Sequence, residues 1–552
     1  MGTQRIFGTL DPFVESADVM GRTVANAAFL DALMRADPFD AYHFFMPSKR
    51  EQVRQEGLLA ARYPQAAGRS AFTVLTRQDL PRALGATDYA VFHLSDCLTA
   101  QARLAAVRNA LARSLFPITG TTHSLSYAAY QRDFLAHLWP GTTRRDAIVA
   151  TSTAGRAAVA AMFAALRRGY GLSPEAYPAP ELALIPLGVD PAGWTRLEGE
   201  ARASARVRFG VAPETTALLV FGRISHSSKM DLLPIFRAVP RLIAAGVPAA
   251  GLTLVVAGWT DDDDPFLATL ADLAANIGLA LTLVRRPDEA AKRALFGLAD
   301  VFVSLADNPQ ETFGLTLLEA MAAGLPVVAS DYDGYRDIVV HGQTGWLLPT
   351  LGPAETGERD LLAPLCYDNH THLRLAQSLA VDVPALAEAL ATLIRDPQLG
   401  RAMGQAGRAR AVEGFDWDAC VTRHLALWER LAAAPVPDRE RLARLPHPLT
   451  LAYGEVFAGH PSGRLDDGVR LTWSRAGQAL YKRQDFPVIY KELDQEIRPD
   501  ALRILVFLAR SGCPGLTLAK RLAAAVPGLD VQAATFHVLW ALKQDLLEKE
   551  HQ

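Results

Sequence analysis

Short apolar runs alternate with amphipathic stretches along the first part of the chain. Residues 18–35 place Val24, Ala27, Ala28 and Leu30 at the spacing of one helical face, and further helices are predicted at 99–112 and 154–168. Strands are predicted between them at 5–8, 43–46, 72–75, 89–93, 117–120, 147–150 and 182–185. Strands and helices in alternation predict a parallel sheet covered on both faces, which is a doubly wound α/β domain.

A second alternating series follows the turn-rich segment 185–190. Its strands are predicted at 217–221, 253–257, 281–284, 300–304 and 327–330. We therefore expect two Rossmann-like domains, residues 1–195 and 196–412. Open α/β sheets bind ligands beyond the carboxyl ends of their strands. The cleft between two such domains is therefore the expected active site.

The rest of the chain departs from this alternation. Residues 350–380 interrupt the second domain and are predicted to form an inserted loop or lid, and helices are predicted at 383–394, 399–412 and 417–431. The Ala- and Pro-rich run 432–437 is typical of a linker. Residues 441–552 are expected to form a separate accessory module, with helices at 500–510, 516–525 and 531–550.

Composition narrows the protein class. Of 552 residues, 50% are hydrophobic and 21% charged, which is ordinary globular usage and excludes wholesale disorder, collagen and coiled coil. The net charge of -3 gives no electrostatic footprint for nucleic acid. Four dispersed cysteines, without a CxxC pair, favour neither a disulfide framework nor a zinc ribbon. With no signal-peptide core at the start and no apolar stretch of spanning length, we expect a cytoplasmic protein.

Two carboxylates eight positions apart are the most informative feature. Glu311 is expected in a loop, and the following Phe313, Gly314 and Leu315 open a helix that carries Glu319. A helix start offers unpaired N–H groups that attract phosphate, and Gly314 permits a close backbone approach. The two carboxylates are expected to face one cleft, where they suit paired sugar hydroxyls. Taken alone, the spacing also fits two solvated glutamates beside an ordinary amphipathic helix.

Basic residues are expected at the same edge of the second sheet. Arg223 closes the first strand of that domain, and Lys229 follows six residues later at the next predicted helix start. A guanidinium fork and a mobile ammonium both suit phosphate oxygens. Together with the helix start at Gly314, they could neutralise a diphosphate leaving group.

These segments in this order resemble glycosyltransferase family 4, the retaining nucleotide-sugar transferases of GT-B architecture. The resemblance covers roughly residues 1–435. It rests on Gly222-Arg223 with Lys229, on Ala299-Asp300 leading to Glu311-x-Phe-Gly, on Glu319-Ala-Met-Ala-x-Gly-x-Pro, and on His341-Gly-x-Thr-Gly-Trp. Residues 413–434, which begin near Phe415-Asp-Trp417, look like the crossover helix that returns the chain to the first domain.

The resemblance implies a role for each matching residue. Arg223, Lys229 and the helix start at Leu315 and Thr316 would bind the donor diphosphate, and Glu319 would hold the ribose. Glu311, with the amides of Phe313, Gly314 and Leu315, would hold the donor sugar. His123 matches a catalytic histidine near the anomeric centre, although a capping or core histidine fits it too. Gly21 matches a glycine loop beside the phosphates, but Met20 departs from the usual Gly-Gly pair.

The implied reaction transfers a sugar from a nucleoside diphosphate sugar to an acceptor with retained anomeric configuration, without a metal or another cofactor. The alternatives are a nucleotide-sugar epimerase on the same fold and a catalytically silent scaffold. The base, the sugar and the acceptor stay open. Acceptor contacts are expected around residues 93–96 and at Tyr127, and peripheral contact with the inner membrane face is a further option.

Two other features suggest metal binding but favour plainer interpretations. The run Asp261–Asp264 invites a metal-binding hypothesis, but its place before a helix favours an acidic cap. Cys366, Asp368, His370 and His372 alternate within the inserted segment, where a polar surface loop is expected rather than zinc.

The accessory module carries 15 Lys/Arg against 12 Asp/Glu from residue 441 onward, a difference of +3. Phe536, Leu539 and Trp540 of its last helix are expected in its core. A winged-helix-like fold that contacts protein or recruits acceptor is favoured over one that binds DNA.

Overall fold

The computed structural model describes residues 4–15, 21–260, 265–494 and 496–550. The chain divides into two compact units, residues 1–449 and 450–552. The predicted run Asp261–Asp264 and the start of the predicted helix 18–35 lie outside the described residues.

A seven-stranded parallel sheet forms the first half of unit 1. Its strand order is β3-β2-β1-β4-β5-β6-β7, so the order reverses between β1 and β4. Every residue of the central strands β1, β4, β5 and β6 is buried, because helices cover both faces of the sheet. The strands are β1 (Ile6–Thr9), β2 (Ala41–Met46), β3 (Phe72–Thr76), β4 (Val91–Leu94), β5 (Ile118–Thr121), β6 (Asp146–Ala150) and β7 (Glu181–Leu184). The main flanking helices are α1 (Gly21–Ala36), α2 (Lys49–Arg62), α4 (Leu80–Ala86), α5 (Gln101–Leu111), α6 (Tyr130–Leu135) and α7 (Thr153–Tyr170).

A second, six-stranded parallel sheet follows in the order β10-β9-β8-β11-β12-β13, and it reverses between β8 and β11. Both sheets are Rossmann-like, as the alternating pattern predicts. The strands are β8 (Thr216–Arg223), β9 (Leu252–Trp259), β10 (Ala280–Arg285), β11 (Val301–Ser304), β12 (Val327–Ser330) and β13 (Gly345–Leu348). The helices are α8 (Gly199–Arg208), α9 (Leu233–Ala244), α10 (Phe266–Asn276), α11 (Glu289–Leu298), α12 (Leu315–Ala322), α13 (Tyr335–Ile338), α16 (Val383–Arg395) and α17 (Pro397–Phe415).

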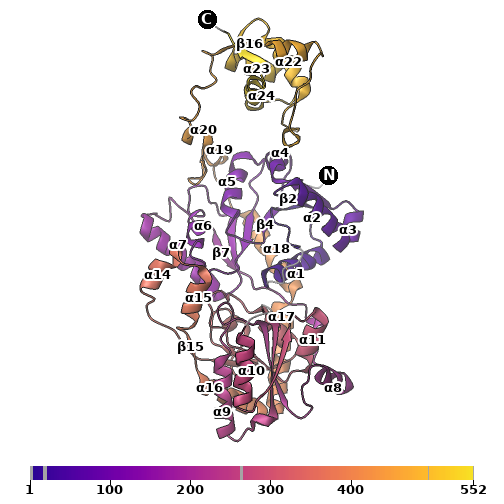
Figure 1. Cartoon of the computed structure of the whole chain (residues 1–552), viewed down its shortest axis with the longest axis vertical. Helices are drawn as coiled ribbons and strands as arrows, with labels where there is room; N and C mark the ends of the chain where they lie inside the picture. The colour runs from indigo at the N-terminus through magenta and orange to yellow at the C-terminus, as the bar shows by residue number, and fades with distance from the viewer. Residues whose placement is uncertain (1–3, 16–20, 261–264, 495, 551–552) are drawn as a thin grey trace. The chain divides into compact units, whose positions relative to one another are not determined.

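The chain returns to the first sheet through α18 (Trp417–Ala433), drawn in orange among the indigo and purple elements of Figure 1. Trp417 and Trp428 join the same core as Phe7 of β1. Trp428 also donates a hydrogen bond of 3.0 Å from its indole nitrogen to Thr119 of β5. The helix α18, which follows the second sheet in the sequence, is therefore part of the core of the first domain.

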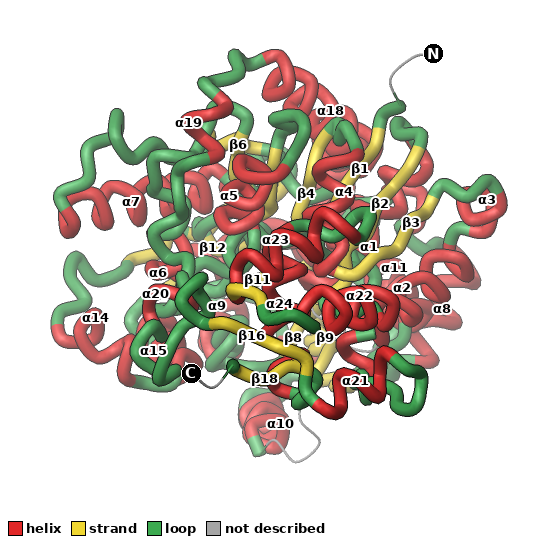
Figure 2. The backbone as a smooth tube through the Cα atoms, turned by 90° about the horizontal axis from the view of Figure 1, so that it is seen from above, coloured by secondary structure: helices red, strands yellow, loops and turns green. Residues whose placement is uncertain are grey.

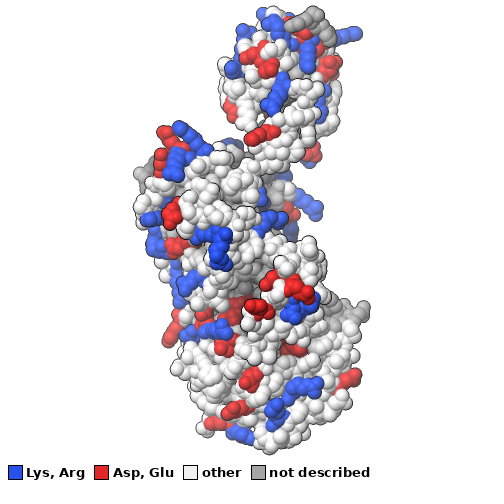
Figure 3. Space-filling view, turned by 90° about the vertical axis from the view of Figure 1, so that its left-hand side faces the viewer, with Lys and Arg blue, Asp and Glu red and all other residues white. Residues whose placement is uncertain are grey.

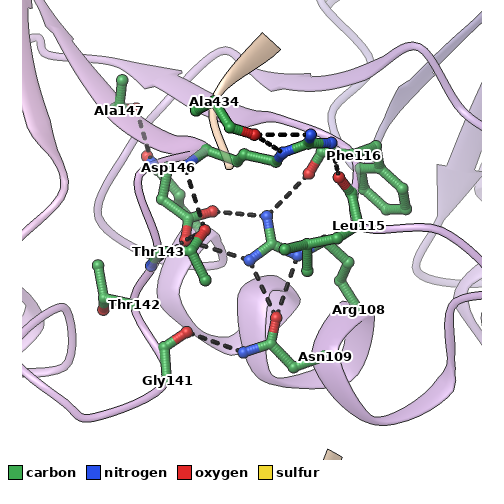
Figure 4. A network of polar contacts seen from close by, with 12 residues as sticks. Arg108, Asn109, Leu115, Phe116, Gly141, Thr142, Thr143, Asp146, Ala147 and Ala434 are labelled. Atoms are coloured by element: carbon green, nitrogen blue, oxygen red, sulfur yellow. Dashed lines mark hydrogen bonds and ion pairs between the residues drawn. The ribbon is translucent and has the colours of Figure 1, made fainter. Parts of the chain in front are cut away.

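A buried ion pair stands at the start of β6 (Figure 4). Arg108 and Asp146 are almost fully buried and lie 2.7 Å apart, and Arg108 also donates to the carbonyl of Phe116. The neighbouring Arg145 donates to the carbonyl of Ala434 at 2.8 Å, just after α18. This network fixes the returning chain to the first domain.

The segment 350–380 is more ordered than predicted. It contains a short antiparallel pair, β14 (Thr350–Leu351) with β15 (Ala380–Val381), and the helices α14 (Glu358–Leu362) and α15 (Asp368–Ala376). The prediction of a polar surface loop is wrong for α15, because His372 is fully buried. Its partners lie in distant parts of the chain, which local polarity does not reveal.

Unit 2 has a core of its own. Helices α21 (Arg475–Tyr481), α22 (Pro499–Ala509), α23 (Gly515–Ala525) and α24 (Val531–Lys543) pack with a three-stranded sheet. The sheet is β17 (Cys513–Pro514), β16 (Arg470–Trp473) and β18 (Leu547–Lys549), and Figure 2 labels β16 and β18 in yellow. The last helix ends at Lys543 rather than at residue 550. Of its predicted core residues, Trp540 is buried, whereas Phe536 is 39% and Leu539 46% exposed.

The surface carries charges of both signs. On the face drawn in Figure 3, basic and acidic side chains are interspersed. No helix within the described ranges is both long and apolar enough to cross a membrane. The same ranges contain no group of three or more His, Cys, Asp or Glu side chains placed to hold a metal ion.

Candidate functional site

One cavity of about 390 Å³ lies between the two sheets, where their strand orders reverse. Its walls come from loops after β5, β8 and β11 and from the start of α1. The structure brings together there eight of the predicted donor-site residues: Gly21, His123, Arg223, Lys229, Glu311, Phe313, Gly314 and Leu315. Ligands of open α/β sheets bind at such reversal points.

His123 is held in one tautomer. Its Nε2 lies 2.7 Å from the carbonyl oxygen of Ser95, which only accepts, so Nε2 carries the proton and Nδ1 is the acceptor. Ser95 is itself fixed by Asp11, which accepts hydrogen bonds from its backbone N–H and its hydroxyl. Burial lowers the pKa of His123 to about 4. The imidazole is therefore neutral and weakly basic at neutral pH.

Lys229 and Glu311 form an ion pair at the cavity wall, although the sequence suggested separate roles for them. Lys229 lies in a turn that precedes α9, not at a helix start as predicted. Burial would raise the pKa of Glu311, but the Lys229 ammonium and the backbone N–H groups of Phe313 and Thr312 outweigh it and lower the pKa. Glu311 is thus a carboxylate at neutral pH.

Gly314 caps the start of α12 with a backbone that requires glycine. Its φ is +116°, and a Cβ atom there would lie 2.5 Å from the ring of Tyr335. The following residues begin the helix with its N–H groups unpaired, and Phe313, Gly314 and Leu315 all line the cavity. Gly21 differs, because a Cβ added there would meet open space. Among the residues that the structure describes, none fills the room beside Gly21, which lines the cavity.

Glu319 lines a neighbouring cavity of about 200 Å³, so the two carboxylates do not share one cavity as the spacing suggested. Leu315 lines both cavities, which makes them adjacent. Glu319 Oε1 accepts from Lys292 at 2.7 Å, while Oε2 has no hydrogen-bond partner within the part of the chain that the structure describes. Burial raises the pKa of Glu319 despite Lys292.

Thr316 lines neither cavity, but it lies one turn before Glu319 on α12. Its buried hydroxyl also lacks a partner among the described residues. Residues three apart share a helix face. That face of α12 therefore presents one unsatisfied hydroxyl and one unsatisfied carboxylate oxygen.

Sequence reasoning missed two carboxylates near Glu311. Burial raises the pKa of Asp307 to about 7, and burial together with the Glu311 charge raises the pKa of Asp333 to about 7. Ser152 of the first domain donates to Asp333 at 3.4 Å. Neither residue belongs to a recognisable motif, and only the fold brings the Asp333 carboxylate within reach of the Glu311 charge.

The inserted helix α15 joins the two sides of the cleft. His372 Nε2 donates to the carbonyl of Ser126 in the first domain at 3.0 Å. Its Nδ1 accepts from Gln310, beside Glu311, at 2.7 Å. Ala128 donates its backbone N–H to Asp368 at 3.3 Å. The predicted acceptor residue Tyr127 packs edge-on against the His372 ring and lines the cavity.

Comparison with known proteins points to one family. Residues 205–356 match the family model described as glycosyl transferases group 1. A D-inositol 3-phosphate glycosyltransferase of Kineococcus radiotolerans is 31% identical over 285 residues, which are 49% of this chain and 55% of that protein. A GDP-mannose-dependent phosphatidylinositol monomannoside mannosyltransferase of Mycolicibacterium smegmatis is 28% identical over 44% of this chain and 54% of its own length. The chain thus spans about half the length of these curated relatives.

Solved structures agree on the fold. The Anabaena protein HepE in complex with UDP has a TM-score of 0.51 and 16% identity, over 77% of this chain and 100% of that one. A glycosyltransferase from Rickettsia africae has a TM-score of 0.51 and 13% identity, over 79% of this chain and 100% of that one. The two facing Rossmann-like sheets are the GT-B fold expected from the sequence.

Proposed function

We propose that this protein transfers a sugar from a nucleoside diphosphate sugar to an acceptor, with retention of anomeric configuration. The match of residues 205–356 to the family model of glycosyl transferases group 1 supports this proposal. The observation that carries the proposal is the convergence of Arg223, Lys229 and the open start of α12 on one cavity. These groups supply positive charge where a diphosphate would leave. Preorganised donors aimed at developing charge are a large term in enzyme catalysis.

The donor is divided between the two adjacent cavities. In the larger one, Arg223, Lys229 and the N–H group of Leu315 hold the diphosphate beside Gly21. In the smaller one, Oε2 of Glu319 accepts from the ribose hydroxyls. Glu311 and the amides of Phe313 and Gly314 hold the donor sugar. Arg223, Lys229 and the helix start would stabilise the phosphate charge, and the proposal includes no metal.

His123 acts at the anomeric centre as a hydrogen-bonding group. With a pKa of about 4, it is too weak a base to take a proton from an acceptor hydroxyl at neutral pH. In the transfer, the bond between the anomeric carbon and the diphosphate oxygen breaks, and the acceptor oxygen bonds to that carbon on the same face. The acceptor proton passes to the departing phosphate oxygen, which is the stronger base.

We infer a separate role for the accessory module, in contact with a protein partner or in recruiting the acceptor. The support is the apolar surface that Phe536 and Leu539 expose on α24. The two residues lie three apart on one helix face, and contiguous apolar patches on a surface often mark contact sites.

A thermal-shift panel of nucleoside diphosphates and their sugars tests the donor assignment. A ligand that binds only the folded state stabilises it by mass action and so raises the melting temperature. At a ligand concentration of a hundred times Kd, the free energy of unfolding rises by about 2.7 kcal/mol. We expect one base to give a clear rise in the wild type, lost in Arg223→Ala. Arg241→Ala, an exposed arginine of α9, is the matched control and keeps the rise. No rise with any nucleotide would contradict the proposal.

A further inference from the structure

A second, strongly basic cavity lies at the amino-terminal ends of the strands of the second sheet. Its volume is about 180 Å³, and Arg196, Arg202, Arg206 and Arg401 line it together with Asp300. The arginines come from the loop before α8, from α8 itself and from α17. Arg202 and Arg206 are four residues apart, so both point from the same face of α8.

Arg206 alone accounts for the structural role of this cluster. It is buried, and its Nη1 donates to the carbonyls of Ala212, Pro213 and Thr215. Its Nη2 donates to Asp300 at 2.6 Å. These bonds fasten α8 and the following turn to the start of β11. Three more arginines are not needed for that purpose.

Asp300, which already binds three of these arginines, has no free acceptor position left. A carboxylate has about four acceptor positions. Asp300 accepts from Arg196 at 3.4 Å, Arg202 at 2.5 Å, Arg206 and the backbone N–H of Ala217. Within the described ranges, the buried Nε of Arg202 has no partner, and Arg401 makes no ion pair. Guanidinium donors therefore exceed the acceptors that the protein supplies.

The charge balance of the cluster is positive. Four guanidinium groups face Asp300 and the nearby Glu198. Burial, reinforced by neighbouring guanidinium charges and opposed by Asp300, lowers the pKa of Arg196 and of Arg206. Cations held together in this way are stabilised by an added anion. The cavity has room for roughly six waters at about 30 Å³ each, which is enough for a phosphate group and part of its carrier.

This cavity is distinct from the proposed donor site. It includes Thr216 and Val301, at the amino ends of β8 and β11, whereas Arg223 lies at the carboxyl end of β8. Seven residue steps at about 3.3 Å each separate the two ends of β8 by roughly 23 Å. A phosphate group of the donor cannot occupy both.

We propose that the cavity formed by Arg196, Arg202, Arg206 and Arg401 binds a phosphate group other than that of the donor. The forked geometry of arginine suits bidentate contact with phosphate oxygens. The phosphate belongs either to a soluble phosphorylated molecule or to a lipid headgroup. This inference is independent of the sugar-transfer proposal, since it involves none of the same residues.

Titration of the full-length protein with inorganic phosphate, at constant ionic strength, tests the site. We expect the melting temperature to rise with phosphate, and the apparent Kd to weaken about tenfold or more when Arg196 and Arg401 are both changed to alanine, because charge-assisted contacts contribute strongly. Arg401 is exposed and Arg196 half-buried, so the double variant should fold. Arg241→Ala and Arg223→Ala should keep the response, the first as a charge control and the second as a test against binding at the donor site.

Vesicle sedimentation distinguishes the two sources of phosphate. Wild-type protein that sediments with phosphatidylglycerol vesicles but not with phosphatidylcholine vesicles, through Arg196 and Arg401, identifies a lipid headgroup. Phosphate binding without sedimentation identifies a soluble phosphorylated molecule. Equal responses of wild type and double variant in both experiments, or no response in either, would overturn the proposal.

Discussion

At the scale of single residues, the two oxygens of the Glu319 carboxylate differ in their hydrogen bonding. Oε1 is bound to the Lys292 ammonium, and Oε2 lacks a partner among the residues described. Leaving a buried acceptor unsatisfied costs about 1–3 kcal/mol. Such a cost persists at functional sites, where a ligand removes it. Thr316, one turn earlier, has the same property.

Glu319→Gln should therefore weaken nucleotide binding about tenfold or more, since hydrogen bonds to a charged group contribute about 1.5–3 kcal/mol. The same change leaves the Lys292 charge unpaired and should lower the melting temperature. Isothermal titration with the nucleotide that the panel selects measures the affinity. Glu289→Gln, an exposed glutamate at the start of α11, is the control. Equal affinities in the two variants would remove Glu319 from the ribose site.

Buried histidines make the first domain sensitive to acid. Burial lowers the pKa of His424 to about 4, against about 6.5 in the unfolded chain. Between these values the unfolded state binds more protons, so the free energy of unfolding falls as the pH is lowered. On going from pH 7.5 to pH 5.5, the free energy of unfolding of the wild type should fall by about 1.4 kcal/mol more than that of His424→Phe. Urea denaturation at both pH values measures this, and a constant difference would contradict it.

At the scale of elements, the sequence predicts what local pattern determines. The long apolar runs of β8 and β9 are buried on both faces, so the pattern alone located them. The sequence pattern predicts a helix through β18, because Leu546 and Leu547 continue the helical spacing. The partner strand β16 lies more than 70 residues earlier and leaves no local signal. The ion pair of Lys229 with Glu311 is not predictable from the sequence for the same reason, since 82 positions separate the two residues. Contacts of this length depend on the assembled fold.

The helix α15 provides a prediction at this scale. His372 joins Ser126 of the first domain to Gln310 of the second, so His372→Ala should loosen the cleft at that edge. We expect faster hydrogen exchange in α15 and in residues 124–128. We also expect a larger share of donor hydrolysis relative to transfer, because closed sites exclude water. His370→Ala, an exposed histidine of the same helix, should leave both unchanged. A matching effect in both variants would mean that the contact has no such role.

At the scale of the whole molecule, the two units have separate cores. The candidate donor site is built entirely from residues before 450, including α18, which returns to complete the first core. Unit 2 buries its own apolar cluster around Leu502, Leu518 and Val538. Domains with independent cores can fold alone. The family model matches residues 205–356, which lie within the first unit, so the role of the second unit needs a test of its own.

A protein cut after Leu449 should therefore bind the selected nucleotide with the affinity of the full chain, within about twofold. Residues 450–552 expressed alone should unfold cooperatively, with a single transition in urea. A cut after residue 415 is the contrasting control, because it removes α18 with Trp417 and Trp428 from the first core, and it should give an unstable protein. If the 1–449 fragment keeps its nucleotide affinity but transfers sugar to the natural acceptor more slowly, unit 2 is assigned to acceptor recruitment. Loss of nucleotide binding in that fragment would show instead that unit 2 is needed for the donor site itself.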